Sequence, residues 1–101
     1  MREMSCPQVT IRELKQKLFA YDDVQIVDVR EIDEYREGHI EGATLIPLGI
    51  LPYRLEEVDR NKEVVLVCRS GNRSSQACEL LRERGFYNVR SLQGGLSSWT
   101  A

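Results

Sequence analysis

Residues 64–67, with the sequence VVLV, constrain the fold of this chain more than any other segment. A strand with one face in water alternates apolar and polar side chains, whereas a central strand of a parallel sheet is covered on both faces and is apolar throughout. Because all four residues are apolar, we expect a central parallel strand here. This strand leads directly into Cys68.

A first helix is expected near the N-terminus. Thr10 is placed to cap it, and Glu13 completes a capping box three residues later. Apolar residues follow at helical spacing on one face, namely Ile11, Leu14, Leu18 and Phe19. The pattern therefore predicts an amphipathic helix.

Strand and helix patterns alternate through the rest of the chain. The first half is predicted to contain a strand at 24–29, a short helix at 31–37 closed by Gly38, and a strand at 43–46 stopped by Pro47. A helix follows, with Pro52 in its first turn and Leu51, Leu55 and Val58 on its inner face. The last predicted segments are a helix at 74–84, closed by Gly85 and with Ala77, Leu80 and Leu81 facing inward, a strand at 86–92, and a short terminal helix carrying Trp99. Strands separated by helices imply an α/β domain with a central parallel sheet and helices on both faces. Ligands of such domains bind beyond the carboxyl ends of the strands.

Size and charge limit the classes of function. A chain of 101 residues that is 42% hydrophobic builds one core, so we expect a single domain over residues 1–101 with a flexible terminus at 1–4. Its 14 basic and 16 acidic residues are mixed and leave a net charge of −2. There is no basic tract and no apolar stretch of about 20 residues. We therefore expect no nucleic-acid or membrane partner, and a monomer or weak dimer.

The three cysteines, Cys6, Cys68 and Cys78, are odd in number and contain no CxxC pair. This set fits neither a disulfide framework nor a zinc site. We therefore expect the reducing environment of the cytoplasm, although a secretory leader removed before Met1 would leave no trace. Cys78 is expected to be buried on its helix, too far from Cys68 for a disulfide, and Cys6 has no evident partner.

The loop from Cys68 to Ser74 joins the central strand to a helix. Its thiol would face the unpaired N–H groups and partial positive charge of a helix N-terminus, an environment that binds anions and lowers the pKa of a cysteine. Gly71 permits the positive φ that lets successive N–H groups converge. Arg69 and Arg73 add cationic donor forks suited to a tetrahedral oxyanion. Ser74 is expected to be the helix N-cap, with its hydroxyl near the sulfur.

Motifs spread over residues 5–101 resemble those of the rhodanese family of single-domain sulfurtransferases. The loop CRSGNRS at 68–74 looks like the active-site loop of that family. The N-terminal and C-terminal signatures are similar in Asp28-Val29-Arg30, Glu34-Tyr35, Gly38-His39-Ile40, Gly42-Ala43, Ile46-Pro47, and Gly94-Gly95 followed by Trp99. The motifs occur in the family's order, which makes the resemblance specific.

The resemblance implies a double-displacement transfer of sulfur. Cys68 would attack the outer sulfur of a small anionic donor such as thiosulfate, sulfite would leave, and the Cys68 persulfide would pass sulfur to cyanide, a thiol or a protein acceptor. Such an attack by a thiolate needs no separate general base, and no metal or organic cofactor is implied. The implied site has Cys68 as catalytic residue and, as substrate-binding residues, Arg69, Ser70, Gly71, Asn72, Arg73 and Ser74.

Three further residues are better explained by structural roles. A carboxylate at Asp28 beside the thiolate would raise the pKa of Cys68, so we expect Asp28 to brace a loop or an arginine. His39 is the only histidine and is expected to be structural, because the persulfide route needs no base. Trp99 is expected to pack rather than to bind a ligand.

Two other classes of function remain open. Cdc25-like phosphatases and related arsenate reductases share this architecture and a cysteine in a phosphate-binding loop. Their C-x5-R signature would place arginine at position 74, where this chain has Ser74, so the loop is a residue short for phosphate. The other class is a non-enzymatic interaction module. Rhodanese-like domains of that kind commonly lack the cysteine, whereas Cys68 is present here.

Overall fold

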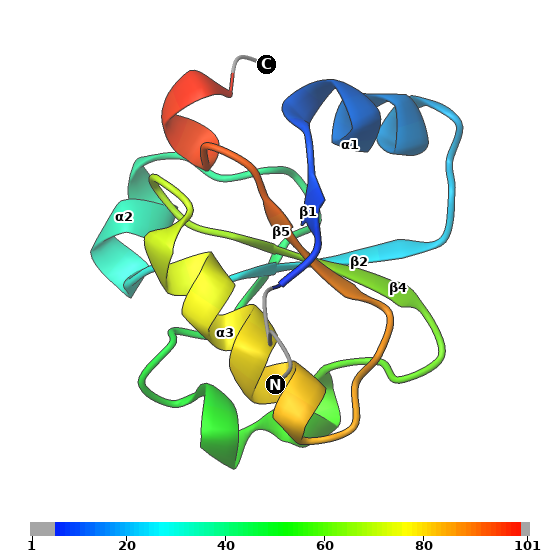
Figure 1. The fold of residues 1–101 in the computed structure, drawn as a ribbon. Coiled ribbons are helices and arrows are strands. Elements are labelled where there is room, and N and C mark those ends of the chain that lie inside the picture. The colour runs from blue at the N-terminus through cyan, green and yellow to red at the C-terminus, as the bar shows by residue number, and fades with distance from the viewer. Residues whose placement is uncertain (1–5, 100–101) are drawn as a thin grey trace.

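A computed structural model describes residues 6–99. Its five strands form one parallel sheet in the order β1-β5-β4-β2-β3 (Figure 1). The elements are β1 (Gln8–Val9), α1 (Ile11–Phe19), β2 (Val24–Asp28), α2 (Ile32–Glu37), β3 (Thr44–Leu45), the 3₁₀ turns η1 (Leu51–Tyr53) and η2 (Leu55–Glu57), β4 (Glu63–Val67), α3 (Asn72–Glu83), β5 (Val89–Leu92) and the 3₁₀ turn η3 (Leu96–Ser98). The α/β class and the parallel sheet are as predicted.

The flexible terminus predicted at 1–4 lies outside the described residues. Within 6–99, no helix has the length and apolarity needed to cross a bilayer.

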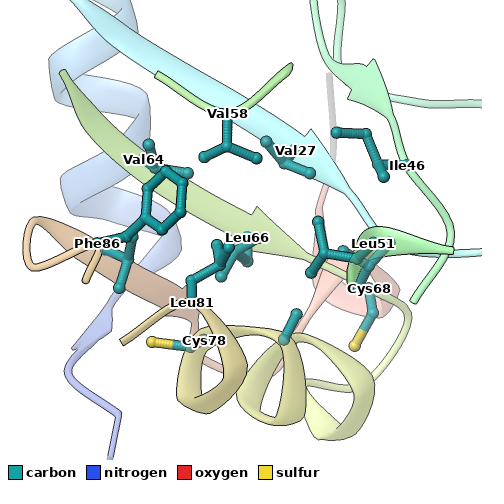
Figure 2. Packing of buried hydrophobic residues seen from close by; sticks show 13 residues of the cluster. Val27, Ile46, Leu51, Val58, Val64, Leu66, Cys68, Cys78, Leu81 and Phe86 are labelled. Atoms are coloured by element: carbon teal, nitrogen blue, oxygen red, sulfur yellow. The ribbon is translucent and has the colours of Figure 1, made fainter. Parts of the chain in front are cut away.

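The central position of β4 explains its apolar sequence. Val64 and Leu66 belong to one core together with residues of α3, whereas Val65 and Val67 belong to a second core with residues of α1. All four side chains are at most 1% exposed. Figure 2 shows the first core, in which Leu66 lies close to Leu81 of α3. Helices therefore cover both faces of the sheet, as predicted.

Several elements differ from the prediction because their patterns are short or broken. The strand predicted at 86–92 is limited to β5, and the terminal helix predicted to carry Trp99 is the 3₁₀ turn η3, which ends at Ser98. The sequence does not predict β1, since two residues are too few to show a period; this strand exists because it pairs with β5. The single helix predicted through Leu51, Leu55 and Val58 is instead η1 and η2, because Arg54 adopts φ −135° and ψ 34° between them. Leu51 and Val58 are nevertheless buried, as expected of an inner face.

The capping box of α1 is confirmed, but one residue of its predicted inner face is wrong. Glu13 N–H donates to Thr10 Oγ1, and Thr10 N–H donates to Glu13 Oε1. Leu14 is fully buried, whereas Phe19 is 88% exposed. At 100° per residue Phe19 lies about 140° around the helix from Leu14, which places it at the rim of the apolar face.

A disulfide joins Cys6 to Cys78, which corrects the expectation that Cys6 has no partner. The two Cα atoms are 5.9 Å apart across a sequence separation of 72 residues. The segment that carries Cys6 precedes β1, and the pairing of β1 with β5 brings it beside α3, where Cys78 is buried. Cys78 is not a partner for Cys68, and the two lie at separate places in the core (Figure 2). Residue spacing alone does not reveal such a long-range pair.

We expect the Cys6→Ser/Cys78→Ser protein to be less stable by about 2–4 kcal/mol, because cross-linking over so long a loop removes much conformational freedom from the unfolded chain. Guanidinium denaturation followed by circular dichroism measures the change. Wild-type protein treated with a phosphine reductant is the matched control and should lose the same amount. Equal midpoints for oxidised, reduced and doubly substituted protein would contradict the prediction.

Candidate active site

Cys68 lies where β4 ends and the loop to α3 begins, at the carboxyl edge of the sheet. Its side chain is 1% exposed, and it is the free cysteine of the described part of the chain. α3 begins at Asn72, because Gly71 in a left-handed conformation (φ +103°) is its N-cap. The prediction of Ser74 as N-cap is therefore wrong: Ser74 lies within the first turn of α3, where its N–H group points back at the loop.

Hydrogen-bond donors of the loop hold the sulfur of Cys68. The N–H groups of Gly71 and Ser74 lie 3.1 and 3.3 Å from Sγ, and the Oγ of Ser74 lies 3.5 Å from it. Burial raises the pKa of the thiol, but hydrogen bonds from the Ser74 hydroxyl and from the N–H groups of Ser74, Gly71 and Ser70 outweigh it. The pKa of Cys68 therefore lies below its ordinary value. The direction agrees with the sequence prediction, and hydrogen bonds are its main cause.

The C-terminal segment donates hydrogen bonds to two carbonyl groups at the start of this loop. The N–H of Leu96 donates to the carbonyl of Cys68 at 2.7 Å, and the N–H of Ser97 donates to the carbonyl of Arg69 at 2.9 Å. Gly95 makes this close approach possible, since a Cβ there would overlap the Arg69 carbonyl and lie 2.6 Å from the Ser70 nitrogen. Gly95, which directly precedes η3, therefore lies against the backbone of the cysteine loop.

Arg73 is engaged by a carboxylate, which changes the role expected from the sequence. Its two terminal nitrogens donate to the two carboxylate oxygens of Glu34 on α2, at 2.7 and 2.9 Å. This contact, together with a hydrogen bond from the N–H of Glu31, lowers the pKa of Glu34 to about 2. The guanidinium fork of Arg73 thus ties the start of α3 to α2. It is not open for a bidentate contact with a substrate anion.

The other predicted substrate-binding side chains lie at the rim of the loop. Arg69, Ser70 and Asn72 are exposed. Of the three, Arg69 also lines a cavity of about 310 Å³, together with Arg30, Glu34, Glu37, Gly38, Leu96 and Ser97. Arg69 is therefore the arginine of the loop that lines this cavity.

Asp28 and Arg30 form a buried pair at the end of β2. Arg30 Nε and Nη2 donate to the carboxylate of Asp28 at 2.8 to 3.2 Å, and Nη2 also donates to the carbonyl of Gly38 at 2.8 Å. Asp28 is fully buried, and Arg30 is 8% exposed. The expectation that Asp28 braces an arginine is confirmed.

His39 and Trp99 also have the structural roles expected of them. The ring of His39 stacks on Tyr35 with 3.6 Å between centroids, and its Nδ1 lies 2.8 Å from the Tyr35 carbonyl oxygen. Trp99 packs against the core on the α1 side, and Lys15 Nζ lies 4.9 Å from the centre of its ring. Neither residue is among the hydrogen-bond partners that the described structure gives the Cys68 sulfur.

One polar residue next to the site escaped the sequence analysis. Ser91 on β5 is fully buried, and its Oγ lies 2.6 Å from the Oγ of Ser74. A lone serine in an apolar strand is a weak signal, and only the pairing of β5 with β4 brings it behind the loop.

The ion pair between Glu34 and Arg73 predicts how acid affects stability. Because folding lowers the pKa of Glu34 to about 2 from its ordinary 4.5, its contribution is complete above about pH 4.5 and is lost as the pH falls through about 2. We expect Glu34→Gln to lower the free energy of unfolding by about 1 kcal/mol at neutral pH. The difference from wild type should shrink on acidification between these values. Urea denaturation from pH 2 to 7 measures it.

The matched control for this change is Glu37→Gln, an exposed position on the same helix. That variant should follow the wild type throughout the range. A difference between Glu34→Gln and wild type that stays constant from pH 7 to pH 2 would contradict the prediction.

The strand order and the loop together define a class of protein. It is a small α/β domain in which a buried free cysteine follows the central strand and accepts hydrogen bonds from converging N–H groups. The family model described as the rhodanese-like domain matches residues 10–101. The chain belongs to the rhodanese-like domain family.

Curated relatives of the chain carry names of sulfur-transfer proteins. YtwF of Bacillus subtilis (strain 168), a putative sulfurtransferase, is 38% identical over 96 residues, which are 95% of this chain and 92% of that protein. The thiosulfate sulfurtransferase GlpE of Shewanella oneidensis is 40% identical over 76 residues, 75% of each protein. The chain also matches the putative sulfur carrier protein YrkF of Bacillus subtilis, at 38% identity, and spans 52% of its length. These names associate the family of this chain with sulfurtransferases.

A solved structure shows the same fold. The rhodanese-like domain protein from Staphylococcus aureus matches with a TM-score of 0.87 at 36% identity, covering 93% of this chain and 91% of that one. The agreement extends over nearly the whole of both chains, so the fold seen here is that of the family.

Proposed function

We propose that this protein is a sulfurtransferase that carries sulfane sulfur as a persulfide on Cys68, with thiosulfate as a donor. The observation that carries the proposal is the buried, free thiol held by the N–H groups of Gly71 and Ser74. Donors oriented in advance stabilise an anionic sulfur without rearranging. The names of the relatives YtwF and GlpE support the same chemistry.

The proposed reaction has two substitutions at sulfur. The Cys68 thiolate attacks the outer sulfur of thiosulfate, a bond forms between the two sulfur atoms, the bond within thiosulfate breaks, and sulfite leaves with the electron pair. Cyanide or a thiol then attacks the outer sulfur of the persulfide and takes it as thiocyanate or as a new persulfide. Cys68 leaves as a thiolate and is ready for another cycle. A thiolate attacks sulfur without a general base, and the scheme uses no metal or organic cofactor.

The residues of the loop divide this work. The N–H groups of Gly71 and Ser74 hold the charged sulfur, and exposed Arg69 attracts the donor anion. Ser70 and Asn72 form the rim that a substrate meets on entry. Arg73 acts through Glu34 to keep the first turn of α3 in place.

The geometry does not favour phosphate chemistry. A C-x5-R loop uses the arginine after the loop to bind phosphate, whereas position 74 here is a serine in contact with the cysteine sulfur. The preceding Arg73 is engaged by Glu34. Neither side chain is placed to close a ring of donors around a phosphoryl group.

Intact-protein mass after incubation with thiosulfate tests the proposal. We expect a gain of one sulfur atom, located by peptide mapping at Cys68 and removed by cyanide. An unchanged mass together with no release of phosphate from an aryl phosphate would indicate an interaction module. Release of phosphate would indicate a phosphatase. Either of these outcomes overturns the proposal.

We further propose that the protein acts in the cytoplasm as a monomer or weak dimer, and that a small thiol or a protein thiol is the final acceptor. A structural disulfide is uncommon in that compartment. We therefore expect alkylation of freshly lysed cells to trap Cys6 and Cys78 as free thiols, whereas a fully formed Cys6–Cys78 bond there would contradict the cytoplasmic location.

A further inference from the structure

The hydroxyl group of Ser91 is hydrogen-bonded to the hydroxyl group of Ser74, and Ser74 in turn contacts the sulfur of Cys68. Ser91 and Ser74 are both fully buried, and their Oγ atoms are 2.6 Å apart. The backbone N–H of Ser91 is already satisfied by the carbonyl of Pro7, which precedes β1. Within residues 6–99, Ser74 Oγ is the one hydrogen-bond partner of the Ser91 hydroxyl. The position of Ser91 is thus set by the sheet, and its side chain is directed at the loop.

The direction of this hydrogen bond follows from the number of available acceptors. If Ser74 donated to Ser91, the proton of the Ser91 hydroxyl would be buried without an acceptor, which is unfavourable. Ser74 has other acceptors, the carbonyl of Gly71 at 3.2 Å and the sulfur of Cys68 at 3.5 Å. Ser91 is therefore the donor and Ser74 the acceptor.

This direction keeps the proton of Ser74 on the side of the cysteine loop. With a thiol at Cys68, the S–H group donates to Ser74 Oγ and Ser74 donates to the Gly71 carbonyl. With a thiolate or a persulfide, the Ser74 proton turns from that carbonyl to the charged sulfur. In both states the Ser74 oxygen keeps a lone pair for Ser91, so the change needs no movement of heavy atoms.

We propose that Ser91 is a positioning residue, which holds the Ser74 hydroxyl as a donor to the sulfur of Cys68. The proposal rests on the function proposed for Cys68, and it adds a residue that touches neither the sulfur nor the substrate. A hydrogen bond received by Ser74 polarises its O–H group and strengthens the bond that it gives. The charged groups around the loop are Arg69, Glu37, the pair of Arg73 with Glu34, and the pair of Arg30 with Asp28.

The test is a double-mutant cycle read out by the pKa of Cys68. The rate at which iodoacetamide alkylates Cys68 is measured from pH 5 to 10 for wild type, Ser91→Ala, Ser74→Ala and the double variant. Quantifying the peptide that contains Cys68 keeps Cys6 and Cys78 out of the measurement. None of these substitutions changes a charged group, so a shift reports the hydroxyl pair.

We expect Ser91→Ala to raise the pKa of Cys68 by up to about 0.6 unit, and to slow alkylation below that pKa by up to about fourfold, since cooperative strengthening is about 10–30% per bond. Ser91→Thr, which retains the hydroxyl, should stay near wild type. In the Ser74→Ala background, Ser91→Ala should cause no further shift, because the group through which Ser91 acts is gone.

Two results would overturn the proposal: no change of the pKa in Ser91→Ala, or the same change with and without the Ser74 hydroxyl. If Ser91→Ala does not fold, Ser91→Cys, which is similar in size but a weaker donor, takes its place and the same two results decide. Alkylation uses no sulfur donor. The cycle can therefore succeed while the thiosulfate experiment fails, and the two proposals stand or fall separately.

Discussion

The Cys68→Ser protein is expected to gain no sulfur from thiosulfate and to form no thiocyanate with cyanide, a loss of the whole activity. A serine hydroxyl stays protonated at neutral pH and does not form the persulfide on which the proposed reaction depends. The fold should remain, because the hydroxyl is smaller than the thiol and meets the same N–H groups of Gly71 and Ser74. We expect the free energy of unfolding to change by less than about 1.5 kcal/mol. Intact mass, colorimetric thiocyanate assay and urea denaturation measure the three quantities.

A matched control separates the role of Cys68 from that of the other sulfur atoms. The Cys6→Ser/Cys78→Ser protein retains Cys68 alone and should still gain one sulfur atom at a temperature where it is folded. Sulfur transfer by Cys68→Ser at a substantial fraction of the wild-type rate would show that the sulfur is carried elsewhere.

Gly95→Ala is expected to have the largest effect on the fold. A Cβ at this position would overlap the Arg69 carbonyl and lie 2.6 Å from the Ser70 nitrogen, and all of these atoms belong to the backbone. The conformation of Gly95, φ +69° and ψ −167°, is also one that residues with a side chain rarely adopt. Strain and overpacking together lower the free energy of unfolding by about 2–6 kcal/mol.

The same substitution should impair the site. The hydrogen bonds from Leu96 to Cys68 and from Ser97 to Arg69 start directly after Gly95. A displaced η3 would release those carbonyls and misalign the donors around the sulfur. We expect a reduced rate of sulfur gain and a higher pKa of Cys68, measured in the folded fraction of the protein.

Gly94→Ala is the matched control for this prediction. Gly94 also has a positive φ of +75°, but a Cβ there would meet no atom within 4 Å. The control should therefore show only the backbone term, about 1–2 kcal/mol, and a nearly normal site. Equal losses for Gly94→Ala and Gly95→Ala would show that the contact with the loop has no special importance.

Local patterns in the sequence were sufficient for the class of fold. The uniformly apolar residues 64–67 predict a strand covered on both faces, and Val65 and Leu66 are indeed packed on opposite sides. The capping box of Thr10 and Glu13 involves neighbours three residues apart, so it too is visible in the sequence. Such features depend on interactions along a few residues.

The position of the reactive cysteine could also be predicted, but its surroundings only in part. Residue order shows that Cys68 follows a central strand and precedes a helix, which is enough to expect a ring of N–H donors. The N-cap of the helix lies three residues before the predicted one, because Gly71 in a left-handed conformation is the cap in place of Ser74. The φ of a single glycine is decided by the packing around it.

Contacts between residues far apart in the chain were decided only by the tertiary structure. Glu34 accepts a hydrogen bond from Arg73 across 39 residues of sequence, so Arg73, which the sequence suggests as a ligand for an anion, instead connects α3 to α2. Cys6 meets Cys78 across 72 residues, and Ser91 reaches Ser74 from another strand. The sequence by itself determined the alternation of strands and helices and the place of one cysteine at the end of a buried strand, because hydrophobic periodicity and turn residues act locally. Which side chains surround that cysteine depends on how the strands are ordered in the sheet, and no local pattern encodes that order.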